Sequence, residues 1–140
     1  MADAVIVSAA RTPIGKAYRG AFNNLEAPSM ASHAVKAAVA RAGVDPGEIE
    51  DCILGAALQQ GTQGINLGRQ VALASGLPVT VSGMTIDRQC SSGLMSVATA
   101  AKQIVHHYLK QRLLNILWPR YFELFNPCIC FEFNCSNIEA

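Results

Sequence analysis

The chain has 140 residues, of which 51% are hydrophobic, and its 11 basic and 10 acidic residues leave a formal net charge of +1. This length fits one modest domain that buries roughly 60% or more of its unfolded surface, and it leaves no room for a second full domain. Because charges of both signs are scattered along the chain, no basic surface for nucleic acid or an anionic membrane is predicted.

The sequence also argues against a membrane or secreted protein. No stretch approaches the roughly 20 apolar residues of a membrane span. The apolar run at residues 4–10 is too short for the core of a signal peptide, and no basic residue precedes it. Five cysteines, an odd number, with Cys52 and Cys90 alone in apolar surroundings, do not fit a secreted disulfide framework. We therefore expect a cytoplasmic protein.

The first predicted elements are a strand and a helix. The apolar, partly β-branched run at residues 5–9 is typical of a strand buried on both faces in a parallel sheet. An apolar stripe along residues 28–42 predicts a helix that Gly43 ends. His33 lies on or beside that stripe, and we assign it no role, because a lone helical histidine is more often a packing residue than a ligand or base.

A short helical turn and a second strand follow. Asp45, Pro46 and Glu48 have the pattern of an N-cap, a first-position proline and a returning acid, which predicts one short turn of helix. Residues 51–57 then read as a strand. Cys52 belongs to this strand and is expected to be a small core residue without chemistry.

The next segment alternates again between loop, helix and strand. Residues 59–69 hold three glycines but lack the Lys-Ser/Thr pair of a phosphate loop and the spacing of a dinucleotide fingerprint. A helix is predicted from residue 67, closed by Gly76 and Pro78, and a third strand at residues 79–87. This alternation predicts a parallel sheet flanked by helices.

The stretch at residues 84–105 reads as a short strand, a sharp turn that holds Cys90, and a helix. Small residues follow Cys90, as is favoured at a helix start, and the positive end of the helix dipole there favours a thiolate. The alternative, a small buried cysteine without chemistry, stays open. Apolar residues recur three and four apart and predict the buried face of the helix: Leu94, Val97, Ala98, Ala101, Ile104 and Val105, with Ser96, Thr99, Lys102 and Gln103 opposite.

The segment IDRQCSSGLMSVATAAKQI, residues 86–104, closely resembles the nucleophile region of the thiolases, acyl-CoA acyltransferases that make or cleave 3-ketoacyl-CoA. The opening RTPIGKAYRG and the loop QQGTQGINLGR resemble the corresponding thiolase segments. The resemblance implies that Cys90 is the catalytic nucleophile, which forms an acyl-thioester intermediate with an acyl-CoA substrate while its backbone N–H helps to hold an oxyanion. It implies no cofactor beyond the coenzyme A thioester.

The resemblance also implies a homo-oligomer. Asn66 and Arg69 would then lie near an association surface, although an N-cap role for Asn66 in a surface loop is an open alternative. Asp87 and Arg88 are expected to hold the turn before Cys90 and to face an interface. The substrate-binding residues stay unassigned.

The resulting fold class is α/β, an incomplete thiolase-like half-domain of three mostly parallel strands flanked by helices over residues 1–105. Right-handed crossovers would place Cys90 at the carboxyl end of the third strand. The composition changes after residue 105, because no glycine and seven of the nine aromatic residues lie beyond it. Residues 106–140 are predicted to be a divergent helical tail, foreign to a truncated thiolase, with the helix extended to about residue 118 and an alternating strand at residues 129–133.

Two further expectations concern the tail and the first strand. The spacing of Cys128, Cys130 and Cys135 is not one of the common zinc patterns, so no metal is predicted. The thiolase strands missing from the sequence would leave the first strand without its neighbour, which predicts an exposed edge and either marginal stability or self-association.

Three interpretations of the function stay open. The first is a thiolase-family acyltransferase, although the histidine and second cysteine motifs that activate thiolases do not occur in the sequence. The second is a non-catalytic remnant that associates with an intact thiolase subunit. The third is a relative of the ketoacyl synthases, which the Gln-Cys-Ser-Ser-Gly setting disfavours.

Overall fold

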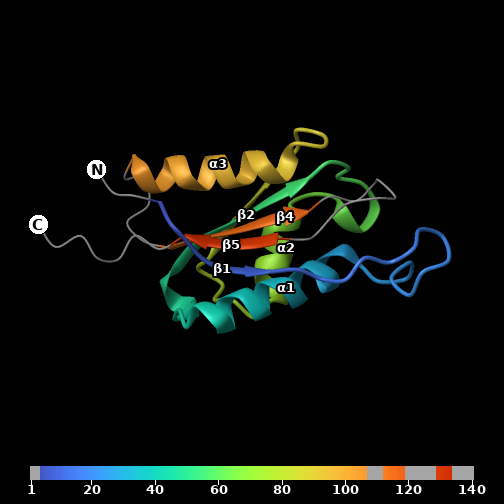
Figure 1. Ribbon diagram of the computed structural model, residues 1–140, viewed down its shortest axis with the longest axis horizontal. Coiled ribbons are helices and arrows are strands. Elements are labelled where there is room, and N and C mark those ends of the chain that lie inside the picture. Colours follow the sequence, from blue (N-terminus) through green and yellow to red (C-terminus); the bar gives the residue numbers. More distant parts are fainter. Residues whose placement is uncertain (1–3, 107–111, 119–128, 134–140) are drawn as a thin grey trace, which may run out of the picture.

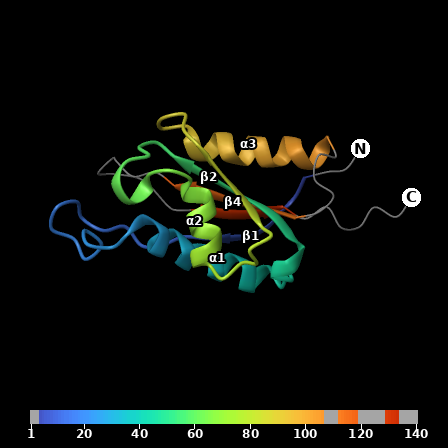
Figure 2. The same cartoon turned by 180° about the vertical axis from the view of Figure 1, so that it is seen from behind.

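The computed structural model describes residues 4–106, 112–118 and 129–133. One sheet carries helices on both faces, with α3 on one side and α1 and α2 on the other (Figures 1 and 2). The predicted α/β class is confirmed. The elements in chain order are β1 (Ile6–Ala10), α1 (Ala27–Ala42), the 3-10 turn η1 (Pro46–Glu48), β2 (Ile49–Ala56), the 3-10 turn η2 (Gly61–Gln63), α2 (Leu67–Ala74), β3 (Ser82–Ile86), α3 (Ser92–Val105), β4 (Arg112–Trp118) and β5 (Ile129–Phe133).

The strands lie in the order β1-β5-β4-β2-β3. Strand β2 pairs in parallel with β3 on one side and with β4 on the other. Strand β5 runs antiparallel to both of its neighbours, β1 and β4. Strands β1 to β4 therefore share one direction, and β5 alone runs the other way.

The predicted extension of the last helix to about residue 118 is wrong. Helix α3 ends at Val105, and β4 begins at Arg112 and pairs with β2 along its length. A short, mostly apolar segment such as residues 112–118 fits a buried strand as well as a helix face, and pairing with a distant strand decides between them. The strand predicted at residues 129–133 is confirmed as β5.

Strand β1 differs from the strand expected at this position. It lies at the edge of the sheet, where the exposed fractions of Val5, Ile6 and Val7 are 46%, 54% and 40%. It is therefore not buried on both faces. It does have a neighbour, because β5 pairs with it from Ile6 to Ala10, and its other edge has no paired strand among the residues described. Strand β5 thus lies beside β1, where the sequence predicted that no neighbouring strand would be present, and β4 lies between β5 and β2.

The core lies on both faces of β2. Cys52, Leu54 and Ala56 pack into the apolar cluster formed with α1 and α2. Ile53 points the other way and packs with Ala100 and Ile104 of α3. Because both faces are covered, β2 reads as a nearly continuous apolar run in the sequence.

The residues predicted to cap the end of α1 and the start of η1 do so in the structure. Gly43 takes a left-handed conformation with φ of 65° after the last turn of α1, and its N–H donates to the Val39 carbonyl at 3.2 Å. The Asp45 carboxylate accepts a hydrogen bond from the Gly47 N–H at 2.9 Å at the start of η1.

The buried face of α3 agrees only in part with the face that the apolar spacing predicts. Ile104 is buried and Val97 and Ala101 pack against the core, as expected. Leu94 is 70% exposed, whereas Ser96, placed on the solvent side by the sequence pattern, is fully buried. The Ser96 hydroxyl donates to the Gly93 carbonyl at 2.8 Å, which offsets the cost of burying it. The buried residues of α3 are mostly small, which lets the helix lie close to the sheet: Ser92, Gly93, Ser96, Ala100 and Ile104.

Within the ranges that the structure describes, no helix has both the length and the apolar character needed to cross a membrane.

The central position of β4 leads to a stability prediction. Proline at Asn115 would remove a backbone N–H from a strand that pairs with both β2 and β5. We expect Asn115→Pro to lower the free energy of unfolding by about 1–3 kcal/mol, the cost of an unpaired buried backbone group, or more. Urea unfolding would measure this. Asn115→Ala, which keeps the N–H, is the matched control, and equal urea midpoints for the two variants would contradict the pairing.

Candidate functional site

The site predicted around Cys90 lies at the carboxyl end of β3, as expected. The connection from Asp87 to Ser91 joins β3 to α3 and is exposed throughout. It is the yellow turn at the start of α3 in Figure 1. Cys90 carries a free, exposed thiol and directly precedes Ser91, the N-cap of α3. The positive end of the helix dipole therefore lies beside the residue that carries the thiol.

The turn before Cys90 is tight and hydrogen-bonded. The Asp87 carboxylate accepts from the Gln89 N–H at 2.9 Å, and the Ser91 N–H donates to the Arg88 carbonyl at 3.0 Å. Gln89 has a φ of 50°, a left-handed conformation that is uncommon outside glycine. Ser91, the N-cap residue of α3, makes no side-chain cap hydrogen bond. The polar side chain that binds the turn from within α3 is instead that of Ser92.

The two charged residues of the turn have intramolecular contacts. Asp87 bridges to Gln89, as described above, and one guanidinium nitrogen of Arg88 lies 3.2 Å from the Met95 sulfur in α3. The Asp87 contacts thus lie within the turn, and the Arg88 contact joins the turn to α3. The association role of the two residues stays a prediction.

Asn66 is the N-cap of α2, the role that the sequence left open. Its side-chain oxygen accepts from the Arg69 N–H at 3.1 Å and from the Thr85 hydroxyl at 3.1 Å. Its amide nitrogen donates to the Gly83 carbonyl at 2.7 Å. One side chain therefore caps α2 and binds that helix to β3.

The Arg69 side chain also makes its hydrogen bonds to the segment around β3. Its guanidinium donates to the backbone carbonyls of Val81 and Val79, the latter at 2.9 Å, in the segment that leads into β3. The polar atoms of Asn66 and Arg69 thus hold β3 in place. An interface role for either residue stays a prediction.

Two glycines allow α2 to approach β3, and the sequence did not reveal their role. A Cβ at Gly68 would meet the Met84 carbonyl, and a Cβ at Gly83 would meet the backbone of Arg69. The Gly68 N–H donates to the Thr85 hydroxyl at 2.9 Å. A glycine inside a strand, as at position 83, is the signal that could have indicated such close backbone contact.

Cys52 and Cys90, the free cysteines whose side chains the structure describes, lie in opposite environments. Cys52 is fully buried in β2, and burial, aided by the negative charge of Asp51, raises the pKa of its thiol far above the usual range. It is a core residue, as predicted. Cys90 is exposed, so solvent can reach its thiol.

No described histidine lies beside Cys90, and the one carboxylate of its turn, that of Asp87, accepts from the Gln89 N–H. His33 is exposed on α1, across the sheet from α3. His106 follows the last residue of α3, and a helix of 14 residues is about 20 Å long, so its ring is remote from the turn. The described ranges contain no group of three side chains able to hold a metal ion. Cys128 and Cys135 lie outside those ranges, so the prediction for the tail cysteines stays a prediction.

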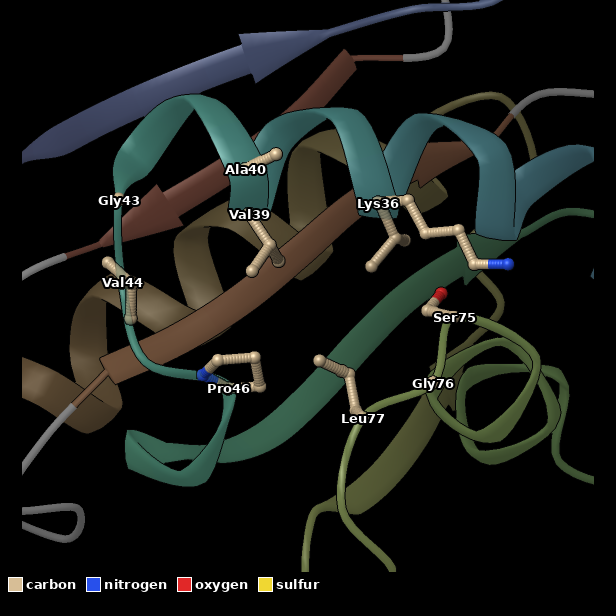
Figure 3. A pocket seen from close by; sticks show the side chains of 10 residues that line it. Lys36, Val39, Ala40, Gly43, Val44, Pro46, Ser75, Gly76 and Leu77 are labelled. Carbon is tan, nitrogen blue, oxygen red and sulfur yellow. The ribbon is translucent and has the colours of Figure 1, made fainter.

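An apolar groove occupies the other end of the molecule. Figure 3 shows it between the end of α1 and the loop that follows α2. Its volume is about 410 Å³, and its walls include Val39, Val44, Pro46 and Leu77. Val44 and Pro46 precede β2 and Leu77 precedes β3, whereas Cys90 follows β3. The groove is therefore not part of the Cys90 site.

Comparison with known protein families shows which family has this sequence and fold. Residues 4–110 match the family model described as thiolase, N-terminal domain. The chain belongs to the thiolase family. It is 44% identical to a 3-ketoacyl-CoA thiolase of Bacillus subtilis (strain 168) over 105 residues, which is 75% of this chain and 27% of that thiolase. It is 44% identical over 102 residues to a 3-ketoacyl-CoA thiolase of Acinetobacter baumannii (strain AYE), covering 73% of this chain and 26% of the relative.

The similarity to the thiolases covers only part of this chain and only part of the relatives. The chain spans about a quarter of the length of these relatives. The matched range includes the Cys90 turn, α2 and the Asn66 contacts, and it stops before β4. The turn that presents Cys90 thus lies wholly within the thiolase-like part of the chain.

The buried thiol of Cys52 predicts a pH dependence of stability. Because its pKa is raised in the folded state, the thiol ionises only after unfolding, so its contribution to stability is complete below the ordinary thiol pKa of about 8.5 and is lost above it. We expect the free energy of unfolding to fall above that pH by up to about 1.4 kcal/mol per pH unit from this group. Urea unfolding from pH 7 to 10 would measure it, and Cys52→Val should lack this component. Parallel curves for the two proteins would contradict the prediction.

The contacts of Asn66 predict a loss of stability on truncation. We expect Asn66→Ala to lower the free energy of unfolding by about 1–2 kcal/mol, since it removes an N-cap and the bond to β3. Asn24→Ala, at an exposed loop position, is the matched control and should change it by less than about 0.5 kcal/mol. Unchanged stability with altered self-association would instead favour the interface interpretation of Asn66.

Proposed function

We propose that this chain carries the nucleophile of a thiolase-family acyltransferase and that Cys90 accepts the acyl group of an acyl-CoA. The observation that carries the proposal is an exposed thiol held on a hydrogen-bonded turn between the carboxyl end of β3 and the start of α3. The chain's membership of the thiolase family supports the acyl-CoA substrate class.

The proposed step is the exchange of one thioester for another. The Cys90 Sγ attacks the thioester carbonyl, the new C–S bond forms, and the bond to the coenzyme A sulfur breaks. The thiol proton leaves with coenzyme A, so atoms and charges balance. The result is an S-acyl cysteine that a second acceptor can attack.

Two features of the turn favour this step. The N-terminus of α3 beside Cys90 favours a negatively charged tetrahedral intermediate. We also propose that the Cys90 backbone N–H donates to the oxyanion, in keeping with the family resemblance. No described histidine lies near enough to take the thiol proton, so acyl transfer to this chain should be slow.

The same intermediate serves both directions of thiolase chemistry. Thiolytic cleavage of a 3-ketoacyl-CoA and Claisen condensation of two acyl-CoA molecules both pass through the S-acyl cysteine. We place the chain in fatty acid metabolism on the strength of its relatives, which are named 3-ketoacyl-CoA thiolases. Association with further copies of the chain belongs to the same proposal.

Acyl transfer to Cys90 can be measured directly. Trypsin cleaves after Arg88 and Lys102 and releases a peptide, residues 89–102, that contains Cys90 as its one cysteine. After incubation with acetyl-CoA, mass spectrometry should find an acetyl group on this peptide. The adduct should be removed by hydroxylamine, as expected of a thioester, and Cys90→Ala should abolish it.

The peptide that contains Cys52 is an internal control, because this buried thiol should stay unmodified while the protein is folded. Iodoacetamide should alkylate Cys90 under the same conditions, which shows that the thiol is accessible. Alkylation without acetylation would contradict the proposal and favour the non-catalytic alternative.

A further inference from the structure

The Ser92 hydroxyl connects α3 to the turn that presents Cys90. It accepts a hydrogen bond from the Arg88 N–H at 2.8 Å and donates one to the Gln89 carbonyl at 2.6 Å. Ser92 is 1% exposed, so water does not compete strongly for either bond. One side chain thus binds the backbone of both residues that precede Cys90.

These bonds act on a backbone that would not keep its conformation unaided. The left-handed φ of Gln89 is costly for a residue with a Cβ and persists only where surrounding contacts impose it. The Ser92 hydroxyl holds the Gln89 carbonyl, and the Asp87 carboxylate holds the Gln89 N–H. Both sides of the strained residue are therefore restrained, and the direction of Cys90 follows from them.

Ser92 is itself fixed by the sheet. A Cβ at Gly55 in β2 would meet the backbone of Ser92 and Gly93, so the first turn of α3 rests directly on that strand. The hydroxyl that restrains the turn is thus attached to the centre of the fold rather than to a mobile surface.

We propose that Ser92 is a positioning residue for the Cys90 site, holding the turn so that the Cys90 thiol and backbone N–H keep one orientation. The consequence for acyl transfer rests on the function proposed above. Ser92 itself touches neither the substrate nor the reacting atoms. It acts through the backbone of Arg88 and Gln89.

The chain offers a close control for Ser92. Ser32 is also buried, and its hydroxyl also donates to the carbonyl three residues earlier, at 2.9 Å. This bond lies within α1, on the other side of the sheet from α3. Replacing either serine by alanine removes the same atom and the same type of helical bond, but Ser92→Ala also releases the Arg88 N–H.

The first measurement is independent of acyl transfer. Amide hydrogen exchange by NMR in the full chain should show the Arg88 N–H exchanging about tenfold faster or more in Ser92→Ala than in the wild type. Ser32→Ala should leave this rate within about twofold. Unlabelled Cys52 after iodoacetamide treatment shows that each variant is folded. An unchanged Arg88 rate in folded Ser92→Ala would overturn the proposal.

The second measurement is the rate of acetylation of Cys90 by acetyl-CoA. It should fall between about tenfold and a hundredfold in Ser92→Ala, the effect of a misplaced reacting group, while alkylation by iodoacetamide, which needs no fixed orientation, changes by less than about twofold. Ser92→Thr, which keeps the hydroxyl, should restore much of the acetylation rate.

The outcomes separate the two proposals. Equal acetylation of Ser92→Ala and wild type would overturn the positioning role. A wild type that alkylates but never acetylates would overturn the proposed function, and the Arg88 exchange rate would still decide whether Ser92 holds the turn.

Discussion

The direct contact between β2 and the first turn of α3 is the constraint on which the rest of this structure depends. At Gly55 the strand has no side chain, so the backbone of Ser92 and Gly93 lies against it. Close approach of two backbones leaves little freedom for the helix to shift or rotate. The end of β3 and the start of α3 are therefore fixed relative to each other, and the short turn that joins them must present Cys90 at one place.

A second close contact of the same kind fixes β3. Gly68 and Gly83 let the start of α2 lie against this strand, and Asn66 satisfies polar groups on both elements. In both contacts small residues bring backbones together, and hydroxyl or amide side chains pair the polar groups that this buries. The segment before Cys90 is thus held from α2 on one side and from α3 on the other.

The environments of Cys52 and Cys90 show how the tertiary structure determines the accessibility of a thiol. The sequence predicted a nucleophile at Cys90 and a core residue at Cys52, and the structure adds the environment of each thiol. Burial in the centre of the sheet keeps Cys52 protonated, whereas Cys90 stands in solvent beside a helix N-terminus. Exposure, a tertiary property, separates a core residue from a candidate nucleophile.

The sequence by itself determined the local elements and the family. Caps such as Asp45 and Gly43 and the motif around Cys90 act over a few residues, so their pattern was sufficient to place the helix ends, the turn and the thiolase resemblance. Only the tertiary structure decided that residues 112–118 form a strand beside β2 and that α3 buries Ser96 rather than Leu94. Strand pairing and the choice of a buried helix face depend on residues far apart in the chain, and apolar spacing alone does not distinguish the alternatives.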